Sequence, residues 1–175
     1  MDIQQFLHEY NRGDRNFSEI NLHCADLSNH NLSGIDLSRS DLSGTNFSGA
    51  NLTRANLKHA NLSGADLSNA DLSGAHLEEV NLISTSLNGT NLVGSNLTRA
   101  DMRTADVEGA DMRGANLTEA DIGGANFRRV NLASTCLEGV DFEGVDLEGT
   151  DTSQIHSFPE SVPTGISRDW RTWGG

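Results

Sequence analysis

The stretch ANLTRANLKHANLSGADLSNADLSGAHLEE, residues 50–79, decides the fold, because it consists of six consecutive pentapeptides with leucine at the centre of each. The spacing continues on both sides of this stretch. Every fifth residue from Phe17 to Leu147 is large and apolar, which gives 27 centres in one register. The centres are 19 Leu, four Phe, two Met, one Val and one Ile, and no insertion interrupts them. One structural unit therefore repeats over most of the chain.

A period of five residues fits neither a regular helix nor a regular strand. In an α-helix five residues advance by about 500°, so successive centres would spiral around every face. In a continuous strand an odd period sends alternate centres to opposite sides of the sheet. We therefore expect the chain to turn once per pentapeptide, so that each pentapeptide forms one side of a coil and its centre points inward.

The other positions of the pentapeptide agree with a coil. The residue two before the centre is Ala in 13 of the 27 repeats, and its spacing places it inward beside the centre. The residue between them is Asn or Asp except at His76, Ser86 and Cys136. Asn and Asp side chains brace turns by bonding nearby backbone N–H groups. Gly occupies the second place after the centre in 13 repeats, where a corner needs permissive backbone angles.

These residues carry a resemblance to a known family. The strings ANLSG, ADLSN, ADLSG and AHLEE between residues 60 and 79, and ANLTE at 115–119, resemble the A(D/N)LXX signature of the pentapeptide repeat family. The segment from Leu7 to Phe17 is also similar to the lead-in of cyanobacterial members. The resemblance implies an all-β solenoid, a right-handed quadrilateral β-helix with four pentapeptides per coil. The 27 repeats would then make nearly seven coils, a rod roughly 30 Å long at the usual strand spacing.

A solenoid exposes unpaired backbone at both ends, so each end needs a cap. Residues 2–11 have apolar side chains at the spacing of one helix face: Ile3, Phe6, Leu7 and Tyr10. Asp2 is suited to begin this helix and Gly13 to end it. The sequence therefore divides into an N-terminal helical cap at 1–15, a pentapeptide-repeat β-helix at 16–151 and a C-terminal tail at 152–175.

The tail contains both prolines and both tryptophans of the chain. We expect it to fold over the last coil through its apolar residues: Phe158, Val162, Ile166, Trp170 and Trp173. In the alternative interpretation Trp170 and Trp173 anchor a protein partner or a second copy of the chain, because Trp is a favoured interface residue. The C-terminal end is thus a candidate surface for a homodimer.

Charge and composition narrow the classes of function. The chain has 25 acidic and 12 basic residues and a net charge of -13, which argues against direct binding to nucleic acid or to an anionic membrane. No apolar stretch reaches membrane-spanning length, and the N-terminus lacks the apolar core of a signal peptide. Cys24 and Cys136 lie too far apart in a four-sided coil for a disulfide. We therefore expect a cytoplasmic protein with free thiols.

Counting in steps of 20 residues places outward side chains in columns. One column predicts a surface salt-bridge ladder: Glu19, Arg39, His59, Glu79, Arg99 and Glu119. A second column contains Asp101, Asp121 and Asp141, with Glu143 beside the last. These four acidic residues, with Trp170 and Trp173, are the candidate interaction residues. The four acidic residues indicate a basic partner or a cation. In the alternative interpretation, Asp at these positions only replaces Asn as the residue that braces the turn.

Nothing in the sequence indicates catalysis. The histidines and cysteines lack the spacing of metal ligands, and no phosphate-binding loop or nucleophile elbow is present. We therefore expect no catalytic residues, no metal and no cofactor. The leading hypothesis is a non-enzymatic scaffold that mediates protein–protein interaction, with a regulatory role as one option, and the sequence does not identify the protein partner. The alternative is an acidic rod that mimics DNA and binds DNA gyrase or another DNA-binding protein.

Overall fold

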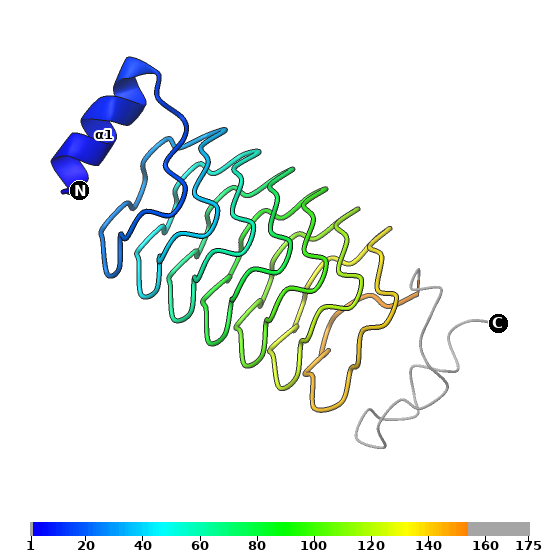
Figure 1. Ribbon diagram of the computed structural model, residues 1–175. Helices are drawn as coiled ribbons and strands as arrows, with labels where there is room; N and C mark the ends of the chain where they lie inside the picture. The colour runs from blue at the N-terminus through cyan, green and yellow to red at the C-terminus, as the bar shows by residue number, and fades with distance from the viewer. Residues whose placement is uncertain (1, 154–175) are drawn as a thin grey trace.

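The repeat winds into a parallel, four-sided solenoid. The structure is a computed structural model that describes residues 2–153. Each pentapeptide contributes one short side, and four of them complete a coil of 20 residues. Coils stack through single parallel β-bridges between residues 20 apart, from Asn16 with Asp36 to Asn131 with Asp151. Figure 1 shows the coils in a straight row with the helix α1 at the N-terminal end.

The four sides are named here by their central residues, which recur every 20 positions. Face 1 contains Phe17 and Leu37, face 2 Leu22 and Leu42, face 3 Leu27 and Phe47, and face 4 Leu32 and Leu52 and their successors. All 27 centres are buried except Leu147, which is half-buried, and the 13 inward alanines are also buried. The predicted inward stacking is therefore confirmed.

Every corner depends on one residue with a left-handed backbone. The residue two after the centre has a positive φ in all 27 repeats, being Gly in 13 and another residue in 14. A hydrogen bond closes the corner, as from Ala55 N–H to Leu52 O at 2.9 Å. A bond between residues three apart, with positive φ only at the third residue, defines a type II turn.

The Asn or Asp before each centre stabilises this turn. Its side chain accepts the backbone N–H two residues later, as at Asp36, where Ser38 N–H donates to Oδ1 over 2.9 Å. Every Asn and Asp at this position makes the same bond, which confirms their predicted role.

The buried Thr residues that point inward bond to the preceding coil, whereas the Ser95 hydroxyl donates to Leu92 O of its own turn at 2.8 Å. Thr85 is fully buried, and its hydroxyl donates to Leu62 O over 2.7 Å. Thr90 makes the equivalent bond to Leu67 O at 2.7 Å. A buried hydroxyl without a partner would be costly, so the backbone carbonyl 23 residues earlier makes Thr acceptable in the core.

A short helix covers the first coil. The helix α1 spans Ile3–Arg12, begins at the N-cap Asp2 and ends at Gly13, whose φ is 110°. Phe6 is fully buried, and its ring packs edge-to-face against Phe17 at 4.8 Å between centroids. The Tyr10 hydroxyl donates to Ser33 O over 2.9 Å, which ties the helix to the coil. No helix in residues 2–153 is long and apolar enough to cross a membrane.

Candidate interaction surface

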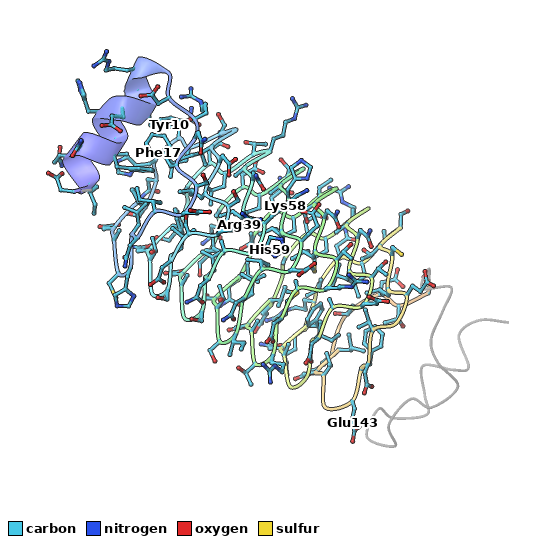
Figure 2. The ribbon with its side chains drawn as sticks, in the orientation of Figure 1. Tyr10, Phe17, Arg39, Lys58, His59 and Glu143 are labelled. Carbon is cyan, nitrogen blue, oxygen red and sulfur yellow. The ribbon has the colours of Figure 1, made fainter. Side chains whose placement is uncertain are left out.

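Face 1 carries the predicted ladder of charges, and its members pair across coils. Glu19 pairs with Arg39, His59 with Glu79, and Arg99 with Glu119 at 2.6 Å, each pair being 20 residues apart. Beside the ladder, Lys58 Nζ lies 3.0 Å from Glu78 Oε1 (Figure 2). The ladder is therefore confirmed as a set of three separate pairs. The two Arg–Glu pairs neutralise charge on this face, whereas the His59–Glu79 pair does so only when His59 is protonated. Exposed pairs of this kind contribute at most about 1 kcal/mol each.

The acidic column of face 2 is partly neutralised by a residue that the sequence columns did not single out. Arg103 Nη2 lies 2.6 Å from Asp101 Oδ2, and its Nε lies 3.6 Å from Asp121 Oδ2. Arg103 therefore sits between two carboxylates of adjacent coils. Arg103 lies two residues after Asp101, at the position directly after the centre of the same repeat. A column made of the residues at that position would have identified Arg103 from the sequence.

The same contacts set the ionisation of Asp101. Hydrogen bonds from the Arg103 side chain and backbone lower the pKa of the Asp101 carboxyl, although partial burial opposes them. The carboxylate in turn raises the pKa of Arg103. Asp111 and Arg113 on face 4 repeat this arrangement, and the Arg113 side chain lowers the pKa of Asp111. Asp101 is thus a paired structural carboxylate with little capacity left for a ligand.

Asp141 and Glu143 lie in the last coil, residues 135–153, and both are exposed. Figure 2 shows Glu143 projecting from the end of the rod opposite Tyr10 and Phe17. Asp141 Oδ1 accepts the Glu143 N–H at 3.0 Å, so the turn is intact. Among the described residues neither carboxylate has a cation within ion-pair distance. Asp141 and Glu143 therefore differ from Asp101 and Asp121, which both contact Arg103.

Coil stacking is interrupted beside Asp141. Asp101 and Asp121 form a β-bridge, but within residues 2–153 no bridge joins Asp121 to Asp141. The last coil remains attached on the other three faces. Cys136 N–H donates to Ala115 O at 2.9 Å on face 1, Asp146 N–H donates to Ala125 O at 3.2 Å on face 3, and Asp151 forms a β-bridge with Asn131 on face 4. Gly123 occupies the column position of Arg103 and has no side chain to neutralise Asp141, whereas Asp121 has Arg103 Nε at 3.6 Å.

The last coil also holds a disproportionate share of the charge. Residues 15–134 contain 14 acidic and nine basic residues, a net charge of -5 over six coils. The last coil has six acidic residues and no basic one: Glu138, Asp141, Glu143, Asp146, Glu148 and Asp151. Arg128 of the preceding coil pairs with two of them, Asp146 at 3.3 Å and Glu148 at 2.6 Å. The other four form the acidic end, defined here as Glu138, Asp141, Glu143 and Asp151.

The remaining candidate residues are placed as follows. Trp170 and Trp173 lie outside the described residues. Within residues 2–153 no group of three His, Cys, Asp or Glu side chains is arranged to hold a metal ion. The four acidic candidates share one face, as predicted, but Arg103 divides them into a paired set and an unpaired set. What this surface offers chemically is negative charge carried on the turns of the solenoid.

Comparison with known proteins agrees with this architecture. The sequence pattern described as Pentapeptide repeats matches eight copies within residues 16–39, 35–74, 75–114 and 110–149. None of the curated protein sequences compared with the chain matches it.

Three solved structures illustrate the likeness. HetL, a pentapeptide repeat protein involved in heterocyst differentiation regulation from the cyanobacterium Nostoc, is 29% identical, with 86% of this chain and 92% of HetL covered and a TM-score of 0.39. A pentapeptide repeat protein from the Arabidopsis thaliana thylakoid lumen is 33% identical over 59% of this chain and 68% of its own, with a TM-score of 0.46. Another pentapeptide repeat protein from Nostoc is 30% identical, with 83% of this chain and 95% of its own chain covered and a TM-score of 0.43. The repeat pattern covers most of the chain, and the protein therefore belongs to the pentapeptide repeat family, with its right-handed quadrilateral β-helix.

Proposed function

We propose that the protein is a non-enzymatic scaffold whose acidic end binds a basic surface of a protein partner. The distribution of charge carries this proposal. Six coils share a net charge of -5, whereas the last coil alone has -6. Its Glu138, Asp141 and Glu143 are exposed and have no cationic partner among the described residues. Unpaired surface charge of one sign attracts a partner of opposite sign and steers its approach.

The rod supports this role because turn bonds position the backbone that carries the carboxylates. The acidic residues are themselves part of the turns. Glu143 N–H donates to Asp141 Oδ1 and Glu148 N–H donates to Asp146 Oδ1, both at 3.0 Å. Phe142 and Val145 are buried beneath them. A partner therefore meets acidic residues whose backbone turns are already formed, which lowers the entropy cost of binding.

The test is affinity capture from an extract of the source cell, followed by binding measurements with the purified partner. The decisive variant is E138Q/D141N/E143Q, which removes three charges from the acidic end. Its matched control is E19Q/E79Q/E119Q, which removes the same number from the face 1 ladder. We expect the first variant to lose the partner and the control to keep it, and binding to weaken at high salt.

Two outcomes would contradict the proposal. The first is that no reproducible partner is captured by the unaltered chain. The second is that both triple variants retain the partner equally, because binding then depends on neither net charge nor the acidic end. Circular dichroism of each variant checks that the solenoid is intact.

The structure offers less support for the DNA-mimic alternative. Such a rod needs unpaired negative charge along its length, as the phosphates of a duplex provide. Here the charges of face 1 pair across coils, and Arg103 neutralises the middle of the face 2 column. A supercoiling assay with purified DNA gyrase tests the alternative, which requires inhibition or protection at micromolar protein.

Three narrower expectations accompany the proposal. Residues 1–15, 16–151 and 152–175 act as cap, solenoid and tail. The protein works in the cytoplasm, an assignment supported by two free, exposed cysteines. A homodimer forms through the C-terminal end, which light scattering of a chain truncated after Asp151 tests by the loss of the dimer mass.

A further inference from the structure

Four side chains of the first two coils form a chain of contacts on face 2. Cys24 Sγ lies 3.2 Å from His23 Nε2, and His23 Nδ1 lies 2.9 Å from Ser43 Oγ. Ser43 Oγ in turn lies 2.6 Å from Asp41 Oδ1. Two adjacent residues of one coil, His23 and Cys24, are thus connected to two residues of the next coil, Asp41 and Ser43, through the contact between His23 and Ser43.

The direction of each hydrogen bond in this series of contacts follows from the carboxylate of Asp41. A carboxylate only accepts hydrogen bonds, so the Ser43 hydroxyl donates to Asp41. Ser43 Oγ is then available to accept, and the His23 Nδ1–H is its donor. A neutral imidazole has one N–H, so His23 Nε2 carries the lone pair that accepts the Cys24 thiol proton. The network selects the one tautomer of His23 that acts as a base toward sulfur.

The scaffold holds these groups in place and leaves the sulfur open. Cys24 N–H donates to Ser43 O at 3.0 Å, and Ser43 N–H donates to Asp41 Oδ1 at 3.1 Å. Cys24 is exposed. The next residue in its corner column is Gly44, where a Cβ would lie only 3.1 Å from the Cys24 sulfur. Glycine at this position therefore preserves the space in front of the thiol.

We propose that Cys24 is a site of reversible S-thiolation by small disulfides such as glutathione disulfide, with His23 as its proton acceptor. His23 Nε2 takes the thiol proton, and the Cys24 thiolate attacks one sulfur of the disulfide. A new S–S bond joins Cys24 to that sulfur while the old S–S bond breaks. The departing thiolate takes the proton from His23, which leaves one small thiol and a neutral imidazole. This modification is independent of the acidic end, which lies in the last coil.

Cys136 is an internal control. It is also exposed, but its sulfur contacts Thr118 Oγ1 at 3.3 Å, and no histidine contacts it among the described residues. The proposal therefore concerns two thiols of the same protein that differ in having or lacking a base. Asp41 is the charged group that the structure records in electrostatic contact with His23.

The experiment compares single-thiol proteins. C136S retains Cys24 and C24S retains Cys136, and each reacts at pH 7 with glutathione disulfide and with an aromatic disulfide that releases a coloured thiol. We expect Cys24 to react at least about tenfold faster, a threshold set below the roughly 100- to 10,000-fold that a positioned base typically contributes. Mass spectrometry of the unaltered chain should find the glutathione adduct on Cys24 before Cys136.

Two further variants in the C136S background test the mechanism. H23Q should reduce the rate at Cys24 to that at Cys136 and remove the difference between their pH–rate profiles. S43A should give an intermediate rate, because the imidazole then loses the bond that fixes its tautomer. Equal rates for the two thiols, or an unchanged rate in H23Q, would overturn the proposal. Because His23 is exposed, melting curves should show that H23Q folds as the parent does.

Discussion

At the scale of single residues, the corner position is the strictest requirement of this fold. Each corner holds a positive φ, and 14 of the 27 are occupied by residues other than glycine. A left-handed conformation costs a residue with a Cβ about 1–2 kcal/mol. The chain tolerates this cost because turn bonds close the corners, except at Ile20 and Val130, whose N–H groups donate to hydroxyls of the following coil, and because neighbouring coils stack on one another.

Substitutions at two glycines distinguish the cost in stability of a positive φ from the cost of a steric clash. Gly109 has a φ of 69° and no atom within 4 Å of an added Cβ, whereas a Cβ at Gly49 would lie 2.5 Å from Asn29 Oδ1. We expect Gly109→Ala to lower the free energy of unfolding by about 1 kcal/mol and Gly49→Ala to lower it further. Urea unfolding measures both. In the Asn29→Gly background the cost of Gly49→Ala should fall to that of Gly109→Ala, and an unchanged cost would refute the steric explanation.

The Asp–Arg pairs make a pH-dependent contribution to stability. Hydrogen bonds from Arg103 and Arg113 lower the pKa of Asp101 and Asp111 in the folded protein. Their stabilisation is therefore complete above the unfolded Asp pKa of about 3.9 and is lost as the pH falls through the lower folded values.

The variant D101N/D111N tests this linkage. Asn keeps the turn bond, as it does in 13 of the 27 repeats, but it lacks the charge. We expect the variant to unfold at lower urea concentration than the unaltered chain at pH 7, with a difference that shrinks below about pH 4. R103Q/R113Q, which removes the main cause of the shift, should show the same convergence. A difference that stays constant with pH would exclude the pairs as its source.

At the scale of elements, the weakest contact between coils lies where charge is uncompensated. The Asp101–Asp121 bridge has Arg103 beside it, and the Asp121–Asp141 pair has Gly123. Two like charges at coil spacing repel by about 1 kcal/mol in water. We attribute the loss of pairing on face 2 of the last coil to this difference in one side chain.

Hydrogen exchange should detect this weak contact. We expect the amides of residues 141–144 to exchange faster than those of 136–139 and 146–149 in the same coil. Asp141→Asn should slow their exchange and raise stability by up to about 1 kcal/mol, because one of the two facing charges is removed. Asp146→Asn is the control and should lower stability, because Asp146 pairs with Arg128. Faster exchange in Asp141→Asn would contradict the electrostatic explanation.

The sequence predicted those features that depend on position within the repeat. The inward centres, the turn-bracing Asn and Asp, the helix over the first coil and the ladder of Glu19 to Glu119 all follow from a period of five and a coil of 20. Contacts that depend on side-chain direction were missed. Arg103 reaches two carboxylates, Thr85 bonds a carbonyl 23 residues earlier, and His23 connects Cys24 to the next coil. These relations join different positions of the repeat, so counting within one column does not reveal them.

At the scale of the whole molecule, the central claim is that 27 repeats form one unbroken four-sided rod with the acidic end at a fixed distance from the cap. The two native cysteines measure this rod, since both are exposed and lie 112 residues apart. In coils of 20 residues they are separated by 5.6 coils, or about 27 Å along the axis at the usual spacing. Coils of three pentapeptides would separate them by roughly 36 Å.

Pulsed electron spin resonance between nitroxide labels on Cys24 and Cys136 tests this claim most directly. Allowing for the width of the rod, the account predicts a narrow distance distribution centred at roughly 30 Å. A broad distribution, or a mean of about 36 Å or more, as coils of three pentapeptides would give, would contradict a single rigid four-sided solenoid.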